Sequence, residues 1–123
     1  TVDRASVVDE IAKRATGRTP RVFLQVNTSG EESKSGCAPG ELNALVDRCR
    51  DRGLVLDGLM TIGPTSGEEQ PTRAAFRLLR RLADDHGLAQ CSMGMSGDIE
   101  IAVEEGSTMV RVGSALFGPR TNP

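Results

Sequence analysis

Apolar residues along this chain recur at two spacings, one typical of helices and one typical of strands. Four segments place apolar residues three or four positions apart, which predicts four amphipathic helices with one face toward a core. Their apolar stripes are Val8, Ile11, Ala12 and Ala15, then Leu42, Leu45, Val46 and Cys49, then Phe76, Leu79 and Ala83, and last Ile99, Ala102 and Val103. Each stripe is followed by a short run rich in strand-forming residues, at 21–26, 54–62, 90–95 and 109–112.

Turn and capping residues separate the predicted elements. Asp3 is placed to cap the first helix, and Gly17 is placed to end it. Pro39 and Pro71 each suit the first turn of a later helix. The run at 21–26 is mostly apolar on both faces, as strands covered on both sides are. Helix and strand alternate four times with short loops between them, and this order predicts an α/β fold with a parallel sheet.

The overall composition narrows the classes of function. The chain has 123 residues, of which 37% are hydrophobic and 26% charged, and its formal net charge is -2. This balance fits one modest globular domain and shows no basic excess of the kind that indicates nucleic-acid binding. No apolar run approaches the ~18 residues of a membrane span, and no signal-peptide pattern is present, so we expect no membrane association.

The three cysteines, Cys37, Cys49 and Cys91, are widely spaced and form no CxxC pair. An odd number of unpaired thiols fits the reducing cytoplasm, where we expect the protein to be located. Because the chain has a single histidine, we expect no zinc site.

The stretch 107–118, STMVRVGSALFG, carries the clearest candidate for binding chemistry. Its first part has the pattern of a short buried strand, in which a cation such as Arg111 needs an anion or a hydrogen-bond acceptor nearby. Gly113 and Ser114 then offer backbone N–H groups and a hydroxyl just before a helical turn at 115–117, an arrangement that suits a phosphate. The spacing alone leaves a plainer interpretation open, in which Arg111 pairs with an aspartate and the glycine only makes a turn.

Three motifs in order along the chain give a more specific indication. They are NTSGEESKSG at 27–36, GLMTIGP at 58–64 and SMGMSGDIEIAVEEGSTMVRVGSALFGPR at 92–120. Together they resemble the pyridoxal phosphate homeostasis protein family, which is related to the N-terminal barrel of alanine racemase. The resemblance implies a TIM (β/α)8 barrel that carries pyridoxal phosphate on a lysine. Such a barrel takes ~250 residues, so residues 1–123, with about four strand-helix units, are expected to be the C-terminal half of a single barrel domain.

The same resemblance implies roles for four residues. Gly113 and Ser114 are expected to hold the cofactor phosphate, with Ser96 as a second phosphate hydroxyl, although a serine there also suits a plain helix cap. Arg111 matches the arginine that faces the pyridine ring nitrogen. A guanidinium cannot accept a proton, so the ring is expected to stay unprotonated and to be a weaker electron sink than a pyridinium.

Four further residues are candidates for the cofactor site, and none is assigned a catalytic role. Met93 and Met95 are expected to line the pocket, with core packing as the alternative. Asn27 and Met60 follow or end predicted strands, which places them on the catalytic face of such a barrel.

The remaining cations are expected to lie outside the site. The family's Schiff-base lysine lies on the first strand of the barrel, so it is expected in the N-terminal half. Lys13 falls on a predicted helix and Lys34 in a polar loop, and neither matches it. The arginines of the third helix are expected on a solvated face; they are Arg77, Arg80 and Arg81.

Three functions fit these observations. The favoured one is a non-catalytic protein that holds pyridoxal phosphate in the cell and hands it over. The second is an amino-acid racemase or a related enzyme on the same barrel, against which the absence of tyrosine counts. The third is a phosphate-binding barrel fragment without cofactor. Because the inner face of a half barrel lacks its opposing strands, we expect it to pair with the N-terminal half or with a second copy of the chain.

Overall fold

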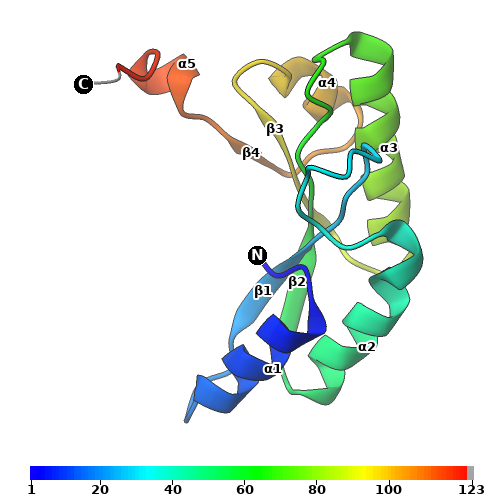
Figure 1. The fold of residues 1–123 in the computed structure, drawn as a ribbon, viewed down its shortest axis with the longest axis vertical. Coiled ribbons are helices and arrows are strands. Elements are labelled where there is room, and N and C mark those ends of the chain that lie inside the picture. Colours follow the sequence, from blue (N-terminus) through cyan, green and yellow to red (C-terminus); the bar gives the residue numbers. More distant parts are fainter. Residues whose placement is uncertain (122–123) are drawn as a thin grey trace.

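A computed structural model describes residues 1–121, in which helices and strands alternate around one parallel sheet (Figure 1). The strands are β1 (Arg21–Gln25), β2 (Val55–Met60), β3 (Gln90–Met95) and β4 (Met109–Arg111). The helices are α1 (Ala5–Arg14), α2 (Leu42–Asp51), α3 (Glu69–Asp85), α4 (Ile99–Glu104) and α5 (Ser114–Phe117), and a single 3-10 turn, η1 (Pro39–Glu41), leads into α2.

The four strands pair in chain order, β1-β2-β3-β4, and every pairing is parallel. This topology confirms the prediction of an α/β fold built from consecutive strand-helix units. One irregularity falls in β2, where Val22 pairs with Leu56 but Phe23 pairs with Gly58, so that Asp57 is an extra residue in the strand. An ideal Cβ at Gly58 would lie 2.3 Å from the Gln90 carbonyl oxygen of β3, so only glycine fits there.

The core lies between the outer face of the sheet and the helices that cover it. The predicted stripes of α2 and α3 are buried, as the periodicity indicated; they are Leu42, Leu45, Val46 and Cys49, and Phe76, Leu79 and Ala83. All three cysteines are buried and unpaired. No helix within residues 1–121 is long and apolar enough to cross a membrane.

The predicted inward stripe of α4 is wrong at one position. Ala102 is fully buried, but Val103 is 59% exposed, and Ile101 packs against the core in its place. The inward face continues from these residues to Glu105, which lies one helical turn further along. A carboxylate on the inward face shifts the apparent apolar stripe, and the periodicity therefore favoured Val103.

Two predicted helix starts also differ from the structure. Arg4, not Asp3, is the N-cap of α1, and the Asp3 carboxylate instead accepts a hydrogen bond from the Gly36 N–H at 3.2 Å. Helix α3 begins at Glu69, two residues before Pro71. Pro71 still lies in the first turn, where a helix needs no donor from it.

Arg80 is not on a solvated face, which corrects the prediction for the third helix. Its guanidinium donates hydrogen bonds to three backbone carbonyls, those of Leu88 at 2.9 Å, Ala89 at 3.2 Å and Gly106 at 3.2 Å. These bonds join the residues before β3 to the end of α4. Arg77 and Arg81 are exposed, as predicted.

Two arginines of α3 bind Glu105 at the end of α4. Arg77 donates to both carboxylate oxygens, at 3.0 and 2.8 Å, and Arg73 donates to one of them at 3.0 Å. Hydrogen bonds from Arg77 and then from Arg73 hold the pKa of Glu105 below its usual value. This ion pair fastens α4, and with it the turn that precedes α4, to the body of the molecule.

Glu105→Gln is expected to make the folded protein less sensitive to acid. Because folding lowers the pKa of Glu105, its contribution to stability is present above the ordinary value of 4.5 and is lost as the pH falls through the folded value. The midpoint of urea unfolding, measured at pH 7 and at pH 3, should therefore change less in the variant than in the natural protein. Glu100→Gln is the control, since Glu100 is exposed and makes no ion pair within residues 1–121; an equal acid response in all three proteins would contradict this prediction.

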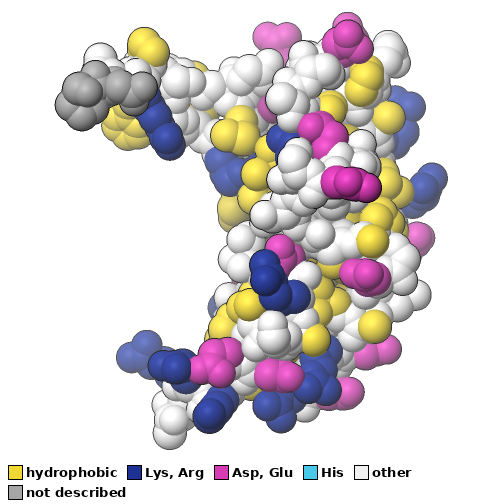
Figure 2. Space-filling model, viewed as in Figure 1, with side chains coloured by type: hydrophobic (Ala, Val, Ile, Leu, Met, Phe, Trp, Pro, Cys, Tyr) yellow, Lys and Arg dark blue, Asp and Glu magenta, His cyan; other side chains and the backbone are white. Residues whose placement is uncertain are grey.

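The molecule curves into an arc whose inner side is the uncovered face of the sheet (Figure 1). Hydrophobic side chains lie along this hollowed side, next to basic ones (Figure 2). The prediction that β4 is a buried strand is wrong: Met109 is 47% exposed and Val112 is 42% exposed. β4 is an edge strand, and Met109, which shares a face with Arg111, lies on the open side of the arc. Val112 lies just beyond the strand.

Candidate functional site

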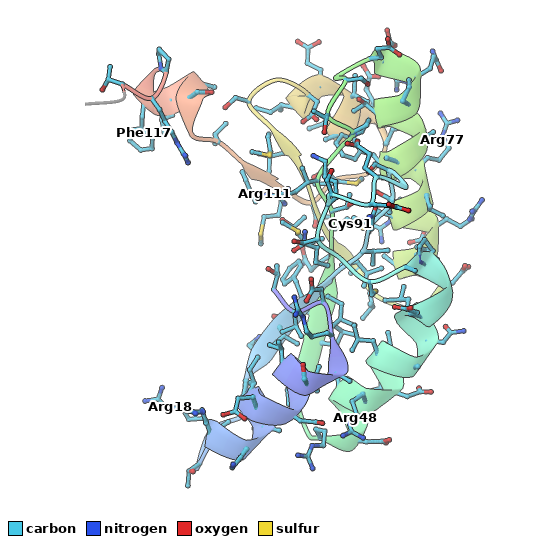
Figure 3. All side chains as sticks on the ribbon, viewed as in Figure 1. Arg18, Arg48, Arg77, Cys91, Arg111 and Phe117 are labelled. Atoms are coloured by element: carbon cyan, nitrogen blue, oxygen red, sulfur yellow. The ribbon has the colours of Figure 1, made fainter. Side chains whose placement is uncertain are left out.

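Five of the eight candidate residues named in the sequence analysis lie around one cavity at the carboxyl ends of β3 and β4. The cavity has a volume of about 550 Å³ and is lined by Met95, Ser96, Gly97, Arg111, Gly113, Ser114, Phe117, Gly118 and Arg120. Figure 3 shows Arg111 on the inner side of the arc and Phe117 on α5, which projects from the body. Parallel strands present their carboxyl ends at one edge of a sheet, so residues from distant turns meet there.

Ser96 links the turn after β3 to α5. Its Oγ accepts a hydrogen bond from the Ala115 N–H at 3.0 Å. Ser96 is not the helix cap that the spacing also allowed, because the N-cap of α4 is Asp98. The Asp98 carboxylate instead accepts a hydrogen bond from the Met95 N–H at 2.7 Å and holds the turn closed.

The turn at Gly113 and Ser114 presents backbone donors to the cavity. Neither N–H group donates a hydrogen bond to any partner within residues 1–121. Both residues are exposed, and an ideal Cβ at Gly113 would meet nothing within 4 Å, so a ligand can approach the backbone closely. With the Ser96 and Ser114 hydroxyls beside them, these N–H groups form a donor set suited to an anion.

Arg111 is bonded only to uncharged acceptors. Its Nη1 donates to the Ser92 hydroxyl at 2.7 Å and to the Ser92 carbonyl at 3.1 Å, and its Nη2 donates to the Thr61 carbonyl at 2.8 Å. Arg111 forms no ion pair within residues 1–121, so the interpretation in which it pairs with an aspartate does not hold for these residues. Burial lowers the pKa of Arg111, which the charge of Asp98 partly opposes, and the guanidinium stays protonated.

The two methionines of β3 face different environments. Met93 is fully buried in the core, which is the alternative that the sequence left open, while Met95 lines the cavity. Residues two apart on a regular strand share a face. Gly94, with φ of 103°, lies where the pairing register of β3 with β4 shifts, and this break directs Met93 and Met95 differently.

The other two candidates, Met60 and Asn27, are not among the residues that line the cavity. Met60 is buried at the end of β2 and pairs with Gln25. The Asn27 side chain is used within its own loop, donating to the Glu31 carbonyl at 2.8 Å and accepting from the Gly30 N–H at 3.0 Å.

The structure adds residues that the sequence analysis missed. Ser92 and Thr61 hold Arg111, while Phe117 and Arg120 line the cavity. The sequence contained a signal for Ser92 and Thr61, since each is a single hydroxyl residue in or next to an apolar strand. The local sequence pattern does not mark Phe117 or Arg120. They reach the cavity because of the position of α5 and of the residues that follow it.

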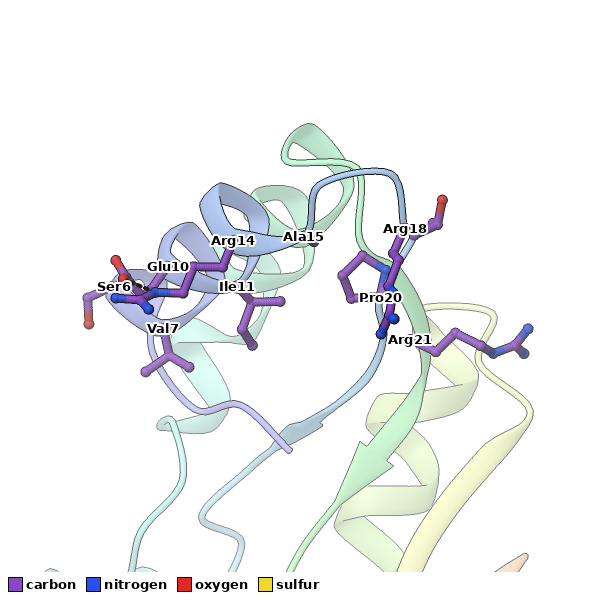
Figure 4. A pocket seen from close by; sticks show the side chains of 10 residues that line it. Ser6, Val7, Glu10, Ile11, Arg14, Ala15, Arg18, Pro20 and Arg21 are labelled. Carbon is purple, nitrogen blue, oxygen red and sulfur yellow. Dashed lines mark hydrogen bonds and ion pairs between the residues drawn. The ribbon is translucent and has the colours of Figure 1, made fainter.

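Other hollows and reactive groups do not match this site. A cavity of about 830 Å³ lies near the opposite end of the sheet, where Glu10 and Arg14 of α1 pair with each other at 2.6 Å beside Arg18 and Pro20 (Figure 4). Burial raises the pKa of Cys37 to about 11, so its thiolate is not available at neutral pH. Within residues 1–121, no three His, Cys, Asp or Glu residues are grouped to hold a metal ion.

The fold is one part of a TIM-type α/β barrel, and the cavity at its edge is lined by groups that suit an anion. Residues 1–121 match the family model described as alanine racemase, N-terminal domain, and the chain belongs to this family. The expected fold class, an alanine racemase type of TIM barrel of which about half is present, is thereby confirmed.

The most similar relatives include proteins named pyridoxal phosphate homeostasis protein. The one from Pseudomonas aeruginosa is 48% identical over 97% of this chain and 54% of its own length. The one from Aquifex aeolicus is 41% identical over 97% of this chain and 56% of its own length. The chain thus spans about half the length of the curated relatives it matches.

Solved structures agree with this assignment. An unknown protein from Bifidobacterium adolescentis matches with a TM-score of 0.88 and 41% identity, over 94% of this chain and 51% of that one. PipY of Synechococcus elongatus with PLP bound matches with a TM-score of 0.80 and 31% identity, over 95% of this chain and 58% of that one. Alanine racemase of Clostridium difficile, at 19% identity and a TM-score of 0.75, shares the fold.

Proposed function

We propose that this chain is the phosphate-binding half of a pyridoxal 5′-phosphate-binding protein, which holds the cofactor and hands it over without catalysing a reaction. The observation that carries the proposal is the cavity at the carboxyl ends of β3 and β4. It combines the N–H groups of Gly113 and Ser114, the Ser96 hydroxyl and an arginine with uncharged partners. Relatives bearing the pyridoxal phosphate name, and PipY with PLP bound, support this ligand over another anion.

The donor set fits the two ends of the cofactor. Gly113, Ser114 and Ser96 would hold the phosphate, which needs several donors and no nearby carboxylate. Arg111 would lie toward the ring nitrogen, and Met95 would border the ring. When bound, pyridoxal phosphate supplies an electrophilic aldehyde and an electron-accepting ring. Because the Arg111 guanidinium donates but never accepts a proton, it keeps the ring nitrogen unprotonated, and this weakens the electron sink.

The lysine that binds the aldehyde belongs, in this proposal, to the other half of the barrel. Lys13 is exposed on α1, and Lys34 lies in the loop after β1; neither is among the residues that line the cavity. The open inner face would be covered by that N-terminal half or by a second copy of this chain. Three buried, unpaired cysteines are consistent with a reducing cytoplasmic location.

Arg111→Glu in the full-length protein is expected to change the visible absorption spectrum of bound pyridoxal phosphate. Removing the cation lets the ring nitrogen take a proton, while the phosphate donors, which come from other residues, continue to anchor the ligand. Spectra are recorded during titration with the cofactor. Arg18→Glu is the matched control, because Arg18 is an exposed arginine beside the distant cavity near α1.

Two results would contradict the proposal. If the natural protein binds no pyridoxal phosphate, the ligand is wrong. If it racemises alanine at ~1–10³ s⁻¹, a rate typical of enzymes, the racemase is the correct function and the non-catalytic role is wrong.

A further inference from the structure

Arg111 lies on a strand that does little by itself to fix its side chain. β4 has only three residues, it is an edge strand, and its inner face is open. A long arginine side chain in such a place has many rotamers, and ordering it costs conformational entropy. Its position therefore depends on the groups that bind it.

The groups that bind Arg111 come from two other strands. The side chain crosses β3, where it binds the hydroxyl and carbonyl of Ser92, and reaches the Thr61 carbonyl at the end of β2. Ser92 is 4% exposed and Thr61 is 1% exposed, so both acceptors are fixed within the packed sheet.

Thr61 is itself held by the first strand. Its hydroxyl donates to the Val26 carbonyl at 2.8 Å and lies 2.8 Å from the Thr28 hydroxyl. A continuous set of hydrogen bonds therefore runs from the end of β1 through Thr61 to Arg111 on β4.

We propose that Ser92 and Thr61 are positioning residues, which aim the Arg111 guanidinium at the ring nitrogen of bound pyridoxal phosphate; this inference rests on the proposed function. Three acceptors in fixed positions order the guanidinium before the ligand arrives. Two of its donor sites, Nε–H and the second N–H of Nη2, make no hydrogen bond within residues 1–121 and remain for the ligand.

The uncharged nature of these acceptors matters as much as their positions. A carboxylate would order Arg111 equally well, but it would neutralise the field that keeps a proton off the ring nitrogen. The other charged groups around Arg111 are Asp98, in the turn before α4, and Arg120, across the cavity. Neither forms a hydrogen bond with Arg111 within residues 1–121, so Ser92 and Thr61 set its direction.

The test uses the full-length protein with pyridoxal 5′-phosphate and follows its visible absorbance as a function of pH. Ser92→Ala removes one acceptor and leaves the backbone in place. The midpoint of the ring-nitrogen transition is expected to rise by about one pH unit, because the loosened cation opposes protonation less. The affinity for the cofactor is expected to fall about tenfold.

A matched control separates positioning from general loosening of the sheet. Ser107→Ala removes a hydroxyl that donates to the Met93 carbonyl at 2.6 Å and to the Met109 carbonyl at 3.0 Å, and that makes no hydrogen bond with Arg111 within residues 1–121. It is expected to lower stability without moving the spectral midpoint. Ser92→Thr keeps the hydroxyl and is expected to restore the natural midpoint.

The outcomes test the positioning role separately from the proposed binding of pyridoxal phosphate. If the natural protein binds the cofactor and Ser92→Ala gives the same midpoint, the positioning role is wrong. If Ser92→Ala does not fold, Ser92→Cys takes its place, because it keeps the size of the side chain and replaces the hydroxyl by a weak acceptor; an unchanged midpoint in that variant has the same meaning. A natural protein that binds no pyridoxal phosphate overturns the proposed function, and the positioning role with it.

Discussion

Residues 1–123, produced without any other polypeptide, are expected to self-associate or precipitate rather than persist as a stable monomer. The inner face of the sheet is open, and the exposed large apolar side chains include Met95, Met109, Val112, Leu116 and Phe117, of which Phe117 is 82% exposed. Large apolar side chains exposed in this number mark an interaction surface in most soluble proteins.

The accessible surface of the whole chain leads to the same expectation. A folded monomer of 13.1 kDa exposes about 6,400 Å². This chain exposes 7496 Å², which is well above that value. The excess is the area that a partner, either the other half of the barrel or a second copy, would cover.

Analytical ultracentrifugation of the isolated chain measures this directly. Met109→Lys, on the inner face, is expected to shift the distribution toward monomer. Val103→Lys is the matched control, because Val103 is also exposed but lies on α4, outside the inner face. The same sample should show no covalent attachment of pyridoxal phosphate; a cooperative, stable monomer that binds the cofactor covalently would contradict both expectations.

Ser114→Asp is expected to weaken cofactor binding by the full-length protein strongly while leaving the fold intact. The new carboxylate would lie where the phosphate is held, and repulsion between them should weaken binding by at least about a hundredfold, which corresponds to about 2.7 kcal/mol. Ser114 is exposed at the start of α5, where an aspartate is well tolerated, so the melting temperature should not fall.

The matched variant is Ser114→Asn, which has the same size without the charge. It is expected to bind at least ten times more tightly than Ser114→Asp. The difference between the two should shrink as salt is added, because ionic strength screens repulsion at an exposed site. Equal affinity in Ser114→Asp and the natural protein would show that the phosphate is not held at this turn.

Much of the fold could be predicted because each element depends on local spacing. The strand at 90–95 is present with the predicted bounds, and the stripe on α2 is buried as expected. The error at Val103 has a non-local cause. Glu105 lies on the inward face of α4 only because Arg73 and Arg77 reach it from another helix, and no periodicity reports such an ion pair.

The site likewise has features that local sequence predicts and contacts that it does not. A glycine turn and a nearby serine are visible in the sequence, and the structure brings Ser96, Arg111, Gly113 and Ser114 to one cavity. The partners of Arg111 are 19 and 50 residues away, and their contact depends on the register of three strands. Such a contact becomes predictable only when the pairing of the strands is known.

The order of the strands in the sheet has a consequence for the way the chain is made. Each strand pairs with the one synthesised just before it, so the sheet can grow by one strand-helix unit at a time as the polypeptide leaves the ribosome. Every pairing joins strands that are neighbours in the sequence, which favours early formation of local structure. Arg111, Gly113 and Ser114 are translated last, at the end of β4 and in the turn after it. If these residues hold the cofactor as proposed, the part of the sheet that positions them is synthesised before they are.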